Sequence, residues 1–208
     1  MPNSVKLIEE SCFWNCTSLS EIKLSTSLKE LPKDCFNDCQ NLKRIEIPNS
    51  VTKIEEKCFY RCSSLSEIIL SNSLIELPEY FCDGRWKLKI IEIPSSITKL
   101  GISCFGLCTS LTEVKLSSSL KELPNDCFYY CKSLKKIEIP SSITKLGEKC
   151  FSKCSSLSDI IFRNENIEFN KYCLGETLLK KENFQNIPDD CFEKFYDENI
   201  DIQFVIGK

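Results

Sequence analysis

The chain has 208 residues, of which 42% are hydrophobic and 27% charged, with a formal net charge of −3 and no histidine. This composition suits a folded protein, gives no basic footprint for nucleic acid, and includes no apolar run long enough for membrane insertion. Residues 1–10 lack the basic and apolar regions of a secretory signal, so we expect a cytoplasmic protein whose 15 cysteines are thiols.

A cysteine–phenylalanine dipeptide recurs along the chain at steps of 23 or 46 residues. Its copies begin at Cys12, Cys35, Cys58, Cys104, Cys127 and Cys150. The missing copy falls at Phe81-Cys82, where the two residue types are exchanged, and one further step reaches Cys173. A register that is kept over eight units predicts a single repeat array.

Each unit carries a Leu-x-x-Ile-x-Leu segment that ends in apolar–polar alternation, which is typical of a half-buried strand. The copies occupy residues 19–24, 42–47, 65–70, 88–93, 111–116, 134–139 and 157–162. Stacked units can build a core that one unit cannot, because each inward side chain packs on its copies in neighbouring units. Pro48, Pro94 and Pro140 are expected to end strands. The Cys-Phe-x-x-Cys segment is expected to form one short helical turn, since its apolar residues recur at i, i+1 and i+4.

A second period of 46 residues lies on the first. Units that enter with Leu-Lys-Glu-Leu-Pro, at 28–32 and 120–124, alternate with units that enter with Val/Ile-Thr-Lys-Ile/Leu, at 51–54, 97–100 and 143–146. This pattern indicates growth of the array by duplication of a pair of units.

The two ends of the array differ. Residues 1–5 copy the middle of a unit at 47–51, so the N-terminal edge has no cap. Three interpretations stay open: a piece of a longer array, a complete product with a raw end, or an edge for end-to-end self-association. We divide the single domain into a regular array, 1–163, and a degenerate C-terminal repeat or cap, 164–208. Its last strand is expected at Ile200, Ile202 and Phe204.

The cysteines form six Cys-x3-Cys pairs, at 12/16, 35/39, 58/62, 104/108, 127/131 and 150/154. Zinc bound by pairs of adjacent units is one interpretation of this spacing. Ladders of small buried side chains are the preferred one, because the ladder period equals the repeat period. Disulfides within a pair are not expected if the pair is helical. Without a histidine base or a phosphate-binding glycine loop, we expect no catalytic residue, no metal and no cofactor, and hence no enzyme.

Two columns of side chains should project from the exposed face of the strands. One column reads Glu21, Arg44, Glu67, Ile90, Glu113, Lys136 and Asp159, and the other reads Lys23, Glu46, Ile69, Glu92, Lys115, Glu138 and Ile161. Charges of alternating sign would keep the sheet soluble and in register. Alternatively, this face binds a protein partner, with exposed isoleucines as anchors. The candidate partner-binding residues are Lys23, Glu46, Ile69, Ile90, Glu92, Lys115, Glu138 and Ile161, with Arg85 and Trp86 of the irregular fourth unit.

The pattern Phe-x-x-Cys-x-Ser-Leu-x-x-Ile-x-Ile-Pro-x-Ser-Ile-Thr-x-Ile resembles the 23-residue leucine-rich repeats of the BspA-like (Treponema pallidum-type) family over about residues 3–163. The resemblance implies an α/β, right-handed leucine-rich-repeat solenoid with a parallel concave sheet and about eight to nine repeats. It also implies a non-catalytic protein–protein interaction or scaffold module. The alternative function is a surface-displayed adhesin that binds host or cell-surface proteins.

Overall fold

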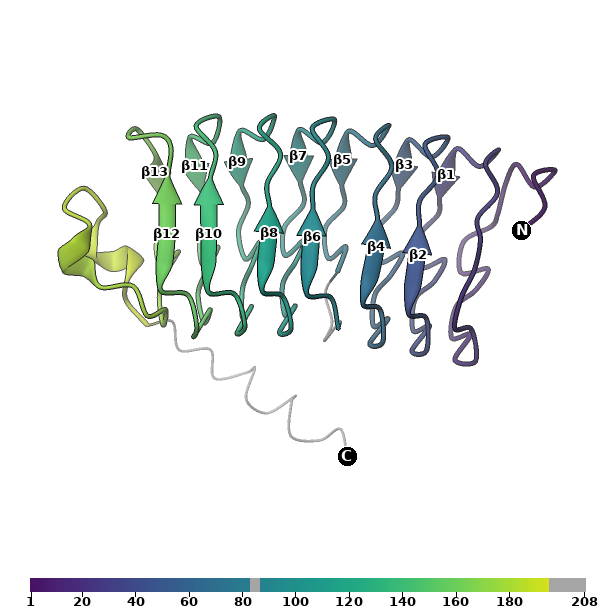
Figure 1. Cartoon of the computed structure of the whole chain (residues 1–208), viewed down its shortest axis with the longest axis horizontal. Coiled ribbons are helices and arrows are strands. Elements are labelled where there is room, and N and C mark those ends of the chain that lie inside the picture. Colours follow the sequence, from purple (N-terminus) through teal and green to yellow (C-terminus); the bar gives the residue numbers. More distant parts are fainter. Residues whose placement is uncertain (83–86, 195–208) are drawn as a thin grey trace.

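The computed structural model describes residues 1–82 and 87–194, which form a β-solenoid of stacked coils with a parallel strand on each of two faces. Figure 1 shows the coils following one another in chain order along the long axis of the molecule. The strands labelled β2 to β12 with even numbers lie on one face, and the shorter odd-numbered strands lie on another. This architecture confirms the predicted leucine-rich-repeat solenoid.

The even-numbered strands form the principal ladder. They are β2 (Arg44–Glu46), β4 (Glu67–Ile69), β6 (Ile90–Glu92), β8 (Glu113–Lys115), β10 (Lys136–Ile139) and β12 (Asp159–Phe162). The first predicted copy, 19–24, contributes an isolated parallel bridge between Glu21 and Arg44 instead of a full strand. The described residues thus contain six regular strands of this kind, fewer than the eight to nine repeats predicted.

Burial alternates along the principal ladder as its sequence predicts. In β2, Ile45 is buried between exposed Arg44 and Glu46, and β4, β6, β8 and β10 begin with the same alternation. In β12 the third residue, Ile161, is half-buried. The inward residues join one continuous core that runs through the coils. Each buried Leu or Ile contributes about 1.5–3 kcal/mol to the free energy of unfolding.

A second set of strands, the minor ladder, comes from the segments that enter each unit. These strands are β1 (Glu30–Leu31), β3 (Lys53–Ile54), β5 (Glu76–Leu77), β7 (Lys99–Leu100), β9 (Glu122–Leu123), β11 (Lys145–Leu146) and β13 (Glu168–Phe169). Their first residues, exposed in six strands and partly exposed at Lys145, alternate between Glu and Lys through all seven strands, so every neighbouring pair has opposite charges. The 46-residue period is therefore a period of charge pairing as well as of duplication.

The 46-residue period also appears in the strand-end turns. Ser71 is fully buried, and its hydroxyl donates to the carbonyl of Val51 at 2.8 Å and accepts from the amide of Ser73 at 3.0 Å. Ser25 and Ser117 make the same pair of bonds. In the intervening coils the sequence places Pro48, Pro94 and Pro140 at this position. Strand ends are thus closed alternately by a serine side chain and by a proline.

The Cys-Phe-x-x-Cys segment does not form the predicted helical turn. Around Cys35, Asp34 and Asp38 have φ values of 55° and 62°, a left-handed conformation that interrupts a right-handed helix. The amide of Phe36 donates to the carbonyl of Cys58 in the next coil at 2.8 Å. The segment is a run of tight turns hydrogen-bonded from coil to coil. The described residues contain two 3-10 turns, η1 (Lys181–Asn183) and η2 (Asp189–Cys191), and no longer helix.

The phenylalanines of these turns stack through the core. Phe13, Phe36 and Phe59 lie nearly parallel, with centroids 5.1 and 5.5 Å apart, as do Phe105, Phe128 and Phe151 farther along. Between the two stacks, Phe81 is turned edge-on to Phe59 and Phe105. The exchange of Phe81 and Cys82 leaves the backbone register intact. The Cys82 amide donates to the carbonyl of Cys104, 22 residues later, as the Phe36 amide does to that of Cys58.

The described part of the C-terminal segment packs on the last coil. Tyr172 and Leu174 donate their amides to the carbonyls of Asp190 and Cys191, both at 2.9 Å. Ile187 and Cys191 are buried in the common core. The division at residue 163 stays a prediction, and the strand expected at Ile200, Ile202 and Phe204 lies outside the described residues.

Candidate protein-binding surface

The outward side chains of the principal ladder form two exposed columns on one face, in the register derived from the repeat. Arg44 lies opposite Glu67, and Glu46 lies opposite Ile69, across β2 and β4. Three pairs of oppositely charged side chains form ion pairs across neighbouring strands: Arg44–Glu67 at 3.2 Å, Lys115–Glu92 at 2.5 Å and Lys136–Asp159 at 2.9 Å. The face is therefore a built array of charges rather than a set of independent surface residues.

Two of the predicted anchors interrupt this alternation of charge at the middle of the face. Ile69 on β4 is 40% exposed, and Ile90 on β6 is 59% exposed. Each lies opposite a carboxylate in the register, Ile69 beside Glu46 and Ile90 beside Glu113. The structure thus places two of the sequence-predicted isoleucines on neighbouring coils, within an acidic surrounding.

The third predicted anchor has a different environment. Ile161 on β12 is half-buried and lies opposite Glu138. Arg163 reaches back to Glu138 with an ion pair of 2.8 Å, and this hydrogen bond lowers the pKa of the Glu138 carboxyl. The carboxylate beside Ile161 is therefore compensated, and sequence reasoning missed Arg163 because it lies outside both columns.

Other predicted residues lie apart from this central pair. Lys23 belongs to the first coil and Lys115 to β8, where it pairs with Glu92. Arg85 and Trp86 lie outside the described residues, so the interpretation of the fourth unit as a hot spot stays a prediction.

The N-terminal coil is the other apolar surface. Leu7 and Trp14 are 63% and 59% exposed, and Cys12 is exposed as well. The cysteines that align with Cys12 in later units are all buried: Cys35, Cys58, Cys104, Cys127, Cys150 and Cys173. End-to-end self-association through this edge stays a prediction.

The cysteine ladders are buried packing elements. Thirteen of the fifteen free cysteines are buried, and Cys16 is partly so. In the second ladder the thiols of Cys39, Cys62 and Cys154 donate to carbonyls of the preceding coil at 3.1 Å. Burial raises the pKa of Cys35 to about 12 and that of Cys39 to about 11, so both thiols are neutral at physiological pH. A neutral, desolvated thiol is a poor nucleophile and a poor metal ligand.

Residues 1–82 and 87–194 contain no group of three or more Cys, Asp, Glu or His side chains that could hold a metal ion. Disulfides within a pair were not expected because the pair was predicted to be helical. The segment is not helical, so helix spacing no longer excludes them. The turns provide a carbonyl acceptor for five second-ladder thiols, those of Cys39, Cys62, Cys108, Cys131 and Cys154.

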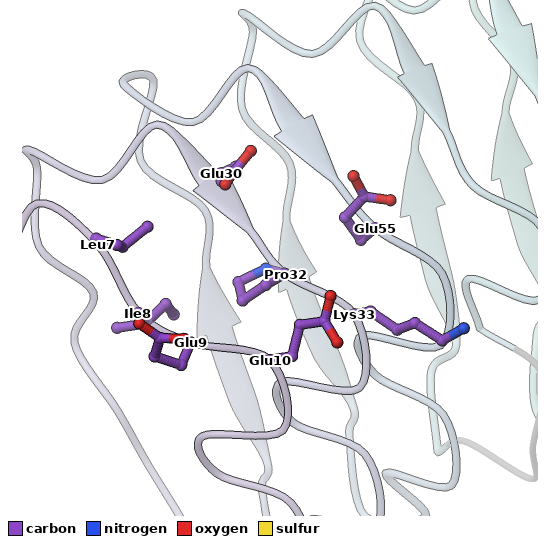
Figure 2. Close-up of a pocket in the computed structure, with 8 residues that line it drawn as sticks. All are labelled: Leu7, Ile8, Glu9, Glu10, Glu30, Pro32, Lys33 and Glu55. Atoms are coloured by element: carbon purple, nitrogen blue, oxygen red, sulfur yellow. The ribbon is translucent and has the colours of Figure 1, made fainter.

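A shallow pocket of about 320 Å³ lies over the first three coils (Figure 2). Its lining includes the carboxylates of Glu9, Glu10, Glu30 and Glu55, with Lys33 at one side. Lys33 makes an ion pair with Glu56 at 3.7 Å. None of the sequence-predicted partner-binding residues lines this pocket, so it is separate from the candidate surface.

Sequence reasoning also missed the minor ladder, although its signal was present. The alternation of Lys-Glu-Leu-Pro with Thr-Lys-Ile places Glu and Lys on neighbouring coils. In the structure the Nζ atom of Lys99 lies 3.9 Å from Oε2 of Glu76, and Nζ of Lys145 lies 2.9 Å from Oε1 of Glu168. This face has a complete alternation of charge, whereas the principal face does not.

Comparison with known proteins places the chain among leucine-rich repeat proteins. The family model described as the BspA type leucine rich repeat region matches residues 1–101 and 76–199, in six copies. No curated protein matches the chain. In the part of the chain that is described, no helix is both long and apolar enough for a membrane span.

Solved structures agree with the family model. A leucine-rich repeat protein from Bacteroides ovatus is 29% identical, with a TM-score of 0.80 over 85% of this chain and 46% of its own. The leucine rich repeat protein of T. pallidum is 27% identical, with a TM-score of 0.68 over 74% of this chain and 72% of its own. This chain thus spans less than half the length of the Bacteroides ovatus protein. The repeat register, the coil geometry and the family model agree, and the chain belongs to the BspA-type leucine-rich repeat family.

Proposed function

We propose that this chain is a non-catalytic protein-interaction module that binds its partner on the exposed face of the principal ladder. Proteins of its family are generally repeat scaffolds. The described residues add buried, neutral thiols, which are poor nucleophiles. Because fold alone does not fix function, the proposal depends on the surface.

The observation that carries the proposal is the pair of exposed isoleucines on a rigid face. Ile69 and Ile90 project from strands whose intervening residues, Ile68 and Ile91, are buried in the core. Their backbone positions are held by parallel pairing to β2 and β8. Exposed apolar side chains that are held in place bind a partner with little loss of conformational entropy.

Site-specific photo-crosslinking tests which face is used. A photoreactive amino acid is placed at Lys115 or Glu138 on the principal face, and at Lys99 or Glu76 on the minor ladder as a matched control. We expect discrete protein adducts from the principal face alone, and their loss when an excess of unmodified chain competes. Adducts of equal yield from both faces, or from neither, would contradict the proposal.

Display of the array on a cell surface is the second candidate function, which the BspA-type family suggests. An amine reagent that cannot cross membranes separates the two candidates. A surface adhesin will be labelled at its lysines on intact cells, whereas an internal module will be labelled only after lysis.

A further inference from the structure

In both ladders, acidic and basic side chains tend to alternate from one coil to the next. The principal face departs from this alternation at a few positions. The minor ladder alternates Glu and Lys without interruption from β1 to β13. In the principal face, acids occupy every second coil of each column, and the positions between them are slots for cations. Lys23, Arg44, Lys115 and Lys136 fill four of these slots, and the last three make the cross-strand ion pairs.

Isoleucine occupies two adjacent cation slots at the centre of the face. Ile69 lies between Glu46 and Glu92 in its column, and Ile90 lies between Glu67 and Glu113 in the other. Glu67 and Glu92 are paired on their outer sides, to Arg44 and Lys115. The centre of the face is therefore apolar, and four carboxylates surround it.

The other two carboxylates, Glu46 and Glu113, have a cation in the outer slot of their column, Lys23 and Lys136, but in the described structure neither cation pairs with them. Among the described residues, no cation forms an ion pair with Glu46 or with Glu113, and the register partner of each is an isoleucine. Ile161 shows the contrast, because the carboxylate beside it, Glu138, is paired with Arg163. The isoleucines at 69 and 90 thus form an apolar pair with an unpaired carboxylate on each side, Glu46 and Glu113.

We infer that the central patch, defined as Glu46, Ile69, Ile90 and Glu113, binds a polypeptide segment in which an apolar side chain lies between two Lys or Arg residues. The apolar side chain covers the isoleucines, and the basic side chains supply the cations that the two slots lack. The inference rests on the proposed function, since it assigns partner chemistry to the same face.

Strand spacing sets the distance between the basic side chains. Glu46 lies on β2 and Glu113 on β8, three coils farther along. Although β4 and β6 are not paired, a coil spacing close to that of paired strands, roughly 4.8 Å, puts the two positions at least about 14 Å apart. An extended segment that rises about 3.3 Å per residue covers this distance in about four residues. The expected motif is therefore two basic residues about four positions apart with an apolar residue between them.

A peptide selection tests the inference. Phage-displayed random 12-residue peptides are selected on the immobilised chain, and in parallel on the double variant Ile69→Lys, Ile90→Lys. This variant fills the two slots and adds opposite-charge neighbours, which stabilise a sheet, so we expect it to fold with an unchanged or higher melting temperature. Selected peptides are then synthesised, and their affinities are measured by fluorescence anisotropy.

We expect the wild-type chain to enrich the basic–apolar–basic motif, and the double variant to bind those peptides at least about tenfold more weakly. Glu46→Gln with Glu113→Gln should also weaken binding and reduce its dependence on salt. The matched control is Ile161→Lys, which makes the same change beside an already compensated carboxylate and should leave the affinity within about twofold.

The other outcomes separate this inference from the proposed function. Peptides without basic residues that are lost on the double variant would uphold the face and overturn the partner chemistry. Peptides that bind the wild-type chain and the double variant equally would overturn the patch, while adducts at Lys115 or Glu138 would still support the principal face. Enrichment of no peptide above background would overturn the inference as well.

Discussion

Raising the pH from about 8 to about 10 is expected to unfold this protein under reducing conditions. Burial is the main cause that raises the pKa of eight thiols, and at Cys173 a hydrogen bond with Cys191 comes first. The nine thiols with raised pKa values are Cys35, Cys39, Cys58, Cys62, Cys82, Cys104, Cys127, Cys131 and Cys173. In the unfolded chain their pKa returns to about 8.5.

The sign follows from the raised values. Below about pH 8.5 both states hold the thiol protons, and the full stability is present. Above it the unfolded state loses protons that the folded state keeps, so the free energy of unfolding falls as the pH rises. Each thiol removes about 1.4 kcal/mol per pH unit once the pH is above about 8.5. Nine thiols together remove roughly 12 kcal/mol per pH unit, which is comparable to the whole stability of a domain.

Urea denaturation at a series of pH values measures this slope, and cysteine removal provides the control. The triple variant Cys58→Ala, Cys104→Ala, Cys127→Ala should lose some stability at pH 7, because it leaves small cavities. Its loss of stability between pH 8.5 and 10 should nevertheless be smaller by about a third, while the contribution of tyrosines cancels in the comparison. An unchanged slope would show that the buried thiols are not the cause.

Replacing Phe128 by alanine is expected to lower the free energy of unfolding by about 3–5 kcal/mol. The ring is fully buried and stacks on Phe105 and Phe151, with centroids 5.5 and 5.4 Å apart. Its removal leaves a cavity in the middle of the array, and coils on either side contact each other only through neighbours. We therefore expect a lower urea midpoint and a less cooperative transition.

The matched control is Trp14→Ala, which removes an exposed aromatic side chain from the first coil. Surface changes of this kind usually alter stability by less than about 0.5 kcal/mol. Hydrogen exchange followed by mass spectrometry should localise the loss of protection in the Phe128 variant to the coils that flank it. Equal effects of the two substitutions, or a uniform loss of protection, would contradict the role of the stack.

The faces of the strands and the stacking of the units follow from the sequence alone. The alternation in Ile-x-Ile, as in Ile45 and Ile47, predicts the buried and exposed sides of each strand, because a strand has a period of two whatever surrounds it. The 23-residue register predicts which copies meet, since units of equal length stack in register. These local rules predicted the core, the two columns and two of the three exposed isoleucines, whereas Ile161 is half-buried.

The turns were not predictable in the same way. The spacing of Cys35, Phe36 and Cys39 suits both a helix and a stack of turns, and the choice depends on hydrogen bonds to the neighbouring coil. Asp34 and Asp38 suit a left-handed backbone, but Lys57, Tyr80 and Leu107 adopt it as well, and they carry no such preference. The minor ladder is similar, because two-residue strands such as Glu30–Leu31 form only when adjacent coils supply their partners.

The sequence by itself determined the repeat length, the buried face of each strand and the identity of the exposed columns. Only the tertiary structure decided which carboxylates are compensated, because ion pairing depends on the reach of side chains from other coils. Arg163 reaches Glu138 from outside the columns, while no described cation reaches Glu46 or Glu113. This difference arises between coils, where periodicity places backbones but does not fix the ends of long side chains.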